Sequence, residues 1–202
     1  MAEPQHRRMT PDEFFEWQKN QERNYELVDG VPVVPLKAMT GATRRHDRLV
    51  TNTMFALMQR LRGGPCWPTT DDIATRIPKG NVRRPDITVD CHPGADAGME
   101  AIEPRVIIEV LSPSTASIDQ INKVEEYKTI PTARVLLIID SRTATVGAWR
   151  LGAAGWQLES YDGLEQVVPL PEIGTELPLS EIYDQIEIRH RMDRERGWPI
   201  PL

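Results

Sequence analysis

Two carboxylates near the middle of the chain have the type and spacing for shared chemistry. Glu109 lies inside the apolar run from Val106 to Leu111, which is typical of a strand buried on both faces. An isolated ionised carboxylate there would cost several kcal/mol of folding free energy. Glu109 must therefore pair with a cation, bind a metal or take up a proton, and a plain salt bridge or an exposed strand end is the alternative.

Asp86 is the second carboxylate. It follows Arg84 and Pro85 and precedes the apolar residues of a strand over 87–91, so we expect it at a strand entry, because proline cannot donate to a sheet ladder. Asp86 and Glu109 then lie at the ends of neighbouring strands. Two carboxylates so placed can hold a divalent cation that activates water and neutralises charge on a phosphodiester. An aspartate that only caps a turn is the alternative.

Two lysines in the helix that follows Glu109 could supply a cation. Lys123 and Lys128 each fall between apolar residues on the helical wheel, so amphipathicity does not choose between them. A surface lysine whose stem covers apolar area is the alternative for either residue.

Glu26 and His46 are weaker candidates. Glu26 lies on the polar face of a predicted hairpin strand, where a glutamate is usually solvated. His46 opens a long helix among several arginines, and basic residues there oppose the helix dipole. An anion held at this end would remove the conflict, whereas a solvated, slightly destabilised helix end is the alternative.

The elements that must position these residues can be read from local patterns. Thr10 to Glu13 forms a capping box that predicts a helix to about Asn20. Asp29-Gly30 between two apolar runs predicts a hairpin. A helical period favours a long helix over 43–61.

The second half of the chain predicts a strand–helix–strand unit with parallel strands over 106–111, 116–130 and 135–139. Short strands follow over 145–150, 156–161 and 166–168, and a short final helix comes after Pro178. We therefore expect one α/β domain over 1–188 and a charged, proline-rich tail over 189–202.

Taken together, these pieces resemble the Uma-two family of endonucleases, a branch of the PD-(D/E)xK superfamily. The resemblance covers roughly residues 10–188. It rests on short motifs whose order and spacing match, namely Tyr25 to Gly30, His46, Arg84-Pro85-Asp86, Ile108 to Ser114, Lys123 with Tyr127, and the strand ending at Asp140.

The resemblance implies a restriction-endonuclease-like core, in which helices flank a mixed β-sheet, with an added antiparallel C-terminal strand set. It implies that Asp86 and Glu109 hold Mg²⁺ or Mn²⁺, with the Val110 carbonyl as a further ligand and Glu26 completing the shell directly or through water. The implied activity is endonucleolytic hydrolysis of DNA.

The superfamily pattern E-x-K would place its lysine at Leu111. In this family the cation comes from the following helix, which points to Lys123 rather than Lys128. The resemblance implies that Lys123 orients the attacking water or stabilises the phosphate. It also implies that Tyr127, His46 and Arg84 support the site or contact a phosphate. The alternative is a catalytically silent interaction domain that keeps the fold, whose carboxylates are a remnant or are held by partners such as Arg83 or Arg84 rather than by a metal. A glycosidase would need an aromatic-rich cleft, whereas the five Trp residues are scattered.

Composition limits the partners. The 202 residues carry a net charge of −6 and a pI near 5.3, which speaks against non-specific phosphate binding. Yet residues 37–84 hold ten basic against three acidic residues, a net charge of +7. We therefore expect weak, salt-dependent DNA binding through one basic face. Without an appended DNA-reading module, a nuclease of this size would form a homodimer or rely on another protein.

We expect the protein to be located in the cytoplasm. No apolar stretch is long enough for a membrane span, and the first residues lack a secretory signal pattern. Cys66 and Cys91 could form one bond, but free thiols are expected in a reducing cytosol.

Overall fold

The centre of the molecule is a six-stranded sheet with the strand order β10-β9-β8-β7-β6-β3. The structure is a computed structural model that describes residues 8–35, 43–92, 94, 97–111 and 118–188. The predicted tail over 189–202 and the last part of the motif from Ile108 to Ser114 lie outside these residues. The six strands are β3 (Trp67–Thr70), β6 (Ile87–Asp90), β7 (Pro104–Leu111), β8 (Val135–Asp140), β9 (Thr145–Gly152) and β10 (Gly155–Asp162).

Strands β7 and β8 run parallel, and the other neighbours in this sheet are antiparallel. Helix α4 (Ile118–Tyr127) connects the two parallel strands, so the predicted strand–helix–strand unit is confirmed. The sheet is therefore mixed, as expected.

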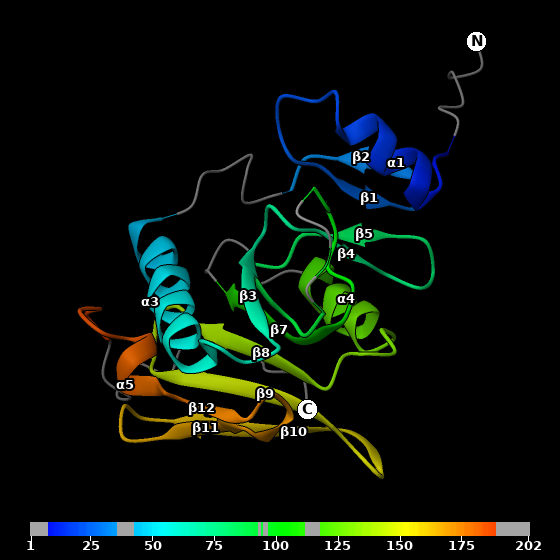
Figure 1. The fold of residues 1–202 in the computed structure, drawn as a ribbon. Coiled ribbons are helices and arrows are strands. Elements are labelled where there is room, and N and C mark those ends of the chain that lie inside the picture. Colours follow the sequence, from blue (N-terminus) through cyan, green and yellow to red (C-terminus); the bar gives the residue numbers. More distant parts are fainter. Residues whose placement is uncertain (1–7, 36–42, 93, 95–96, 112–117, 189–202) are drawn as a thin grey trace.

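Two helices cover opposite faces of the sheet (Figure 1). Helix α3 (Arg44–Leu61) begins after the N-cap Thr43 and packs on the face that includes Ile87 and Ile108. Helix α4 packs on the other face, through Tyr127 against Ile107. The two faces alternate along β7 because successive side chains of a strand point to opposite sides. No helix in the described ranges is long and apolar enough to cross a membrane.

A smaller sheet with the order β2-β1-β5-β4 lies beside α4 (Figure 1). It contains β1 (Glu26–Val28), β2 (Val31–Val33), β4 (Thr75–Arg76) and β5 (Val82–Arg83). Asp29 and Gly30 both have positive φ, as a two-residue hairpin turn requires. The predicted hairpin is therefore confirmed, and β2, which contains Pro32, is an edge strand as proline demands.

Helix α1 (Pro11–Gln18) covers the small sheet. Thr10 and Glu13 form the predicted capping box, and Phe14 packs with Leu27 of β1 and Val82 of β5. The small sheet thus has its own apolar cluster, and it presents Glu26 and Arg83 toward α4.

The C-terminal strands extend the fold as expected. Strands β9 and β10 form a long antiparallel pair at one side of the sheet. They are followed by a second hairpin and short helices, namely β11 (Val167–Leu170), η1 (Pro171–Ile173), β12 (Thr175–Pro178) and α5 (Leu179–Ile182). Buried residues of this segment, including Leu177 and Ile182, join the core beneath α3.

Cys66 and Cys91 are joined by a disulfide, so the expectation of free thiols is wrong. Trp67 pairs with Asp90 in the antiparallel β3–β6 ladder, and one further step along this ladder sets Cys66 opposite Cys91. Directly opposed residues of antiparallel strands bring their Cβ atoms within bonding range of a disulfide. A count of cysteines could not reveal this bond, because it depends on which strands pair.

Candidate functional site

Asp86 and Glu109 meet at one end of the β6–β7 pair. Ile87 lies opposite Ile108, so one more step along the ladder sets Asp86 opposite Glu109. Glu109 shares the face of Ile107, and that face is covered by α4. The sheet register therefore brings together the two carboxylates that the sequence singled out.

Asp86 is held from two sides. The backbone N–H of Val110 donates to its Oδ2 at 2.8 Å. His46 of the first turn of α3 places Nε2 at 3.4 Å from Oδ1. Only 5% of Asp86 is exposed, so these contacts fix the direction of a carboxylate that water reaches poorly.

Helix α4 brings a cation and a hydroxyl to the same place. Lys123 and Tyr127 are four residues apart and therefore share one helix face. The Tyr127 hydroxyl donates to Glu109 Oε1 at 2.7 Å, and Lys123 Nζ lies 2.9 Å from Glu26 Oε1. Lys128 points elsewhere, because it donates to Glu125 at 2.8 Å. Of the two lysines that the helical wheel left open, the structure brings Lys123 to the site.

Glu26 accepts hydrogen bonds from three donors. Besides Lys123, Arg83 Nη1 lies 3.1 Å from Oε2, and the Arg84 backbone N–H donates to Oε1 at 3.1 Å. Burial alone would raise the pKa of Glu26, whose exposed fraction is 2%, but Lys123 and Arg83 outweigh burial and lower it. Glu26 is therefore ionised, and both of its oxygens are occupied by donors.

Arg83, one of the two arginines named as possible partners of the carboxylates, lies at this site and pairs with Glu26. It bridges Glu26 to Glu126 of α4, with Nε at 2.6 Å from Glu126 Oε2 and Nη2 at 3.0 Å from Oε1. Asn81 also donates to Glu126, at 2.7 Å. The only sequence signal for this pair is that Glu26 and Arg83 carry opposite charges on two segments of the chain. The signal becomes useful once β1 and β5 are known to pair. Leu27 lies opposite Val82, which sets Glu26 opposite Arg83.

Arg84 lies beside the site, with its side chain directed to backbone carbonyls. Its side chain is 1% exposed and donates to the carbonyls of Tyr25, Asp71 and Asp72, each at 2.8 Å. Burial lowers the pKa of Arg84. The guanidinium thus joins the loop of Asp71 and Asp72 to Tyr25, which precedes β1, and the Arg84 backbone N–H donates to Glu26.

Lys123 carries a positive charge at neutral pH. Burial lowers the pKa of its amine, but the nearby carboxylates of Glu109 and Glu26 raise it further, so the net direction is upward. Tyr127 likewise stays protonated, because burial and the same two carboxylates raise its pKa well above the ordinary value. The arrangement can therefore donate hydrogen bonds and stabilise negative charge next to the Asp86–Glu109 pair.

The oxygen donors present are of the type that Mg²⁺ prefers. Within the described residues, no three Asp, Glu, His or Cys side chains converge into a complete metal cage. Mg²⁺, however, is usually bound by one or two carboxylates, with water and substrate phosphate filling the other positions. Asp86 and Glu109 fit that pattern, whereas Glu26 is already neutralised by Lys123 and Arg83.

The fold identifies the class of protein to which this chain is similar. The structure resembles a solved structure titled as a putative nuclease belonging to DUF820 from Anabaena variabilis, with a TM-score of 0.67 and 18% identity over 89% of this chain and 99% of that chain. At this identity the likeness concerns the fold, which is therefore of the same type.

The sequence identifies the family within this class. Residues 11–180 match the Uma2 family model, described as "Putative restriction endonuclease", and the chain belongs to that family. It is also 26% identical over 179 residues to the protein slr1290 of Synechocystis, which is described as uncharacterized; the match spans 87% of this chain and 92% of that protein. The resemblance inferred from the sequence motifs is confirmed, and it places the chain among proteins of the restriction-endonuclease type.

Proposed function

We propose that the protein is an endonuclease that hydrolyses phosphodiester bonds in DNA with Mg²⁺ or Mn²⁺ at Asp86 and Glu109. The observation that carries the proposal is the meeting of these two carboxylates at one strand end beside the charged amine of Lys123. Membership of the Uma2 family supports nuclease chemistry.

The metal would be held by Asp86, Glu109 and the Val110 carbonyl. When bound, it would activate water and neutralise charge on the phosphodiester. The ammonium of Lys123 orients the attacking water and stabilises the negative charge that develops on the phosphate. Tyr127 holds Glu109 in place through its hydroxyl, and His46 does the same for Asp86.

Glu26 acts through Lys123 in this proposal rather than as a metal ligand. Its oxygens already accept from two cationic side chains and one amide, and a divalent cation there would meet two positive charges. Glu26 is therefore a positioning residue, which together with Glu109 keeps the Lys123 amine charged, and Arg83 in turn holds Glu26 in place.

A cleavage assay tests the proposal. Supercoiled and single-stranded DNA are incubated with Mg²⁺ or Mn²⁺ and with either the wild-type protein or its Asp86→Asn and Glu109→Gln variants. We expect each variant to cut more than about 100-fold more slowly, since even loss of an outer partner of a metal ligand costs 10–100-fold.

Glu103→Gln is the matched control, because Glu103 immediately precedes the opposite end of β7 and pairs with Arg105. Its rate should equal that of the wild type. If the wild-type protein cuts neither substrate with either metal, or if Glu109→Gln cuts at the wild-type rate, the nuclease proposal is wrong, and the silent interaction domain becomes the better description.

A further inference from the structure

The first turns of α3 and the segment after α5 line an open hollow of about 230 Å³. Three of its lining residues are arginines of α3. The complete lining is Arg44, Arg45, Arg48, Gln185, Ile186 and Glu187. The basic helix start noted in the sequence is therefore a concave surface rather than a flat one.

Two of these arginines donate to backbone carbonyls. Arg45 donates to the carbonyl of Ser141 at 3.1 Å, and Arg48 donates to the carbonyl of Gln185 at 3.0 Å. Both acceptors are neutral. Among the described residues, none of the three arginines forms an ion pair. Arg60 of the same helix differs, because Glu181 neutralises it.

Three acidic residues lie near these arginines. Glu187 is the one acid in the lining, Asp47 lies exposed in the same helical turn, and Asp184 directly precedes Gln185. Within the part of the chain that the structure describes, none of these carboxylates forms an ion pair with Arg44, Arg45 or Arg48, so the guanidinium groups remain available to another anion. The planar guanidinium can donate two parallel hydrogen bonds to one phosphate, which makes a phosphodiester the anion that fits best.

The hollow adjoins the candidate catalytic site. His46 lies in the sequence between Arg45 and Arg48 and contacts Asp86 at 3.4 Å. On the other side, Ser141 follows β8, in which Asp140 is the parallel partner of Leu111, two residues beyond Glu109. Since a strand rises about 3.3 Å per residue, the Ser141 carbonyl that accepts from Arg45 lies within a few residues' length of Glu109.

We propose that the hollow binds a backbone phosphate of the nucleic acid next to the phosphodiester that is cut. This inference rests on the proposed nuclease function and assigns it a substrate contact. Arg44 and Arg48 hold the strand so that the neighbouring phosphate reaches Asp86 and Glu109. Because the contact is to the backbone, it contributes affinity and salt dependence but no sequence preference.

Binding of a labelled 30-base-pair DNA duplex tests the inference without cleavage. Fluorescence anisotropy is measured in the Asp86→Asn background without divalent metal, over a series of NaCl concentrations. We expect Arg44→Gln with Arg48→Gln to weaken binding about tenfold or more at low salt. The slope of log affinity against log salt should fall by about 1 for each arginine that contacts a phosphate.

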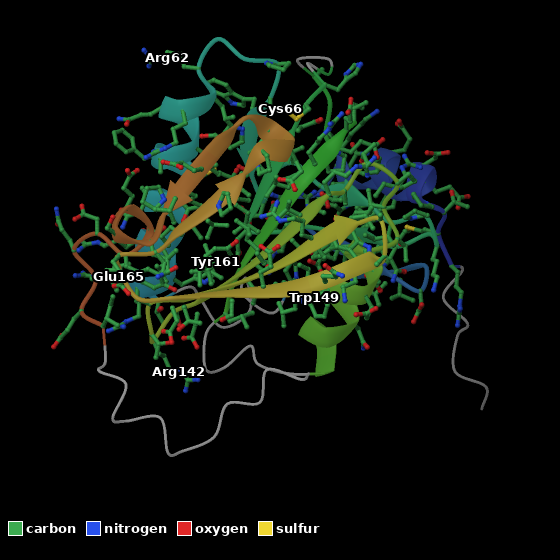
Figure 2. All side chains as sticks on the ribbon, turned by 90° about the horizontal axis from the view of Figure 1, so that it is seen from below. Arg62, Cys66, Arg142, Trp149, Tyr161 and Glu165 are labelled. Carbon is green, nitrogen blue, oxygen red and sulfur yellow. A yellow bond between two sulfur atoms is a disulfide. The ribbon has the colours of Figure 1, made fainter. Side chains whose placement is uncertain are left out.

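Arg62→Gln is the matched control, because Arg62 is an exposed arginine directly after the other end of α3. Figure 2 shows Arg62 at the opposite end of the molecule from Arg142, which adjoins Ser141. The control should bind like its parent. Equal melting temperatures for all variants establish that each one is folded.

The outcomes separate the two proposals. If DNA binding depends on the arginines but the wild-type protein never cuts, phosphate binding in the hollow is supported and the nuclease proposal is overturned. If the wild-type protein cuts DNA but the arginine variants keep the affinity and salt slope of their parent, phosphate binding in the hollow is overturned and the nuclease proposal stands. Failure of the parent protein to bind the duplex at any salt concentration also overturns the hollow.

Discussion

Glu26 accepts from Lys123, from Arg83 and from the Arg84 amide, in a place that water hardly reaches. Removing one partner from a buried ion pair leaves the other charge uncompensated, which costs about 3–5 kcal/mol. We therefore expect Glu26→Gln to lower the free energy of unfolding at neutral pH by a few kcal/mol. Urea unfolding followed by circular dichroism measures this difference.

The same variant has a defined pH dependence. The folded-state pKa of Glu26 lies below its ordinary value of 4.5, so its stabilising contribution is complete above that value and is lost as the pH falls through the folded-state pKa. The stability difference between wild type and Glu26→Gln should therefore shrink below about pH 4.5. A difference that stays constant down to acid unfolding would contradict the ion-pair assignment. Glu16→Gln, which removes an exposed pair with Lys19, should show almost no difference at any pH.

Tyr127→Phe isolates the role of one hydroxyl. The ring is buried and would stay in place, while the hydrogen bond to Glu109 would be lost. Partners that orient a metal ligand typically contribute 10–100-fold in metal affinity or activity. We expect the Mg²⁺ concentration for half-maximal cleavage to rise by about that factor, with a loss of about 1 kcal/mol in stability.

Tyr161→Phe serves as the comparison, since its hydroxyl also donates to a glutamate, Glu159, but on β10. An unchanged Mg²⁺ requirement in Tyr127→Phe would mean that the Tyr127 hydroxyl does not orient Glu109 for metal binding.

The sequence indicated most individual site residues but not their partners. Glu109 was recognisable because an acid inside an apolar strand needs an explanation. The helical wheel could not separate Lys123 from Lys128, since the choice depends on which face of α4 meets Glu26. Arg83 could be named only as one of two arginines that might pair with the carboxylates, because a two-residue strand has too little periodicity to reveal its neighbour.

At the scale of elements, the disulfide ties the edge strand β3 to β6, the strand that begins directly after Asp86. The two cysteines are 25 residues apart in sequence, and closing a loop of that length in the unfolded chain is worth about 3–4 kcal/mol in the chain-entropy model. We expect the Cys66→Ala, Cys91→Ala double variant to melt at a clearly lower temperature than the oxidised wild type.

Measurement in dithiothreitol provides the control. The reductant should lower the melting temperature of the wild type toward that of the double variant and leave the variant itself unchanged. A wild-type protein whose melting temperature does not respond to full reduction, verified by thiol titration, would contradict a stabilising role for this bond.

Element prediction succeeded where local signals were strong. The capping box at Thr10 and the Asp29-Gly30 turn act over a few residues, and the apolar runs of β7 and β8 identify a buried parallel pair. The separate small sheet was not predicted. Its strands β4 and β5 contain two residues each, so their pairing follows from tertiary packing rather than from propensity.

At the scale of the whole molecule, charged side chains fasten the small sheet to the large one. Arg83 of β5 forms an ion pair with Glu126, and Glu26 of β1 forms an ion pair with Lys123; both partners lie on α4. The apolar cluster of the small sheet with α1 is distinct from the two clusters that contain the large sheet. Polar contacts thus contribute strongly to docking the two parts.

Arg83→Met tests this docking. Loss of the cation leaves Glu26 and Glu126 each without one partner, so we expect the small sheet to open locally more often than the large one. In hydrogen exchange, amides of 26–33 should exchange at least about tenfold faster, whereas those of 135–140 keep their wild-type rate. Arg105→Met, which removes a local pair with Glu103, should leave both segments unchanged. Equal acceleration in the two segments would show that Arg83 stabilises the molecule as a whole.

The four-residue spacing of Lys123 and Tyr127 also bears on how such a protein can diverge. Because Lys123 belongs to α4, the place of its amine beside Glu26 depends on the rotational phase of this helix rather than on the alternation of side chains along β7. One inserted residue between Lys123 and Tyr127 would turn one of them by about 100° relative to the other, so that the amine and the hydroxyl could no longer face the carboxylates together. Related chains should therefore vary freely in length elsewhere and keep this short stretch of helix without insertions or deletions.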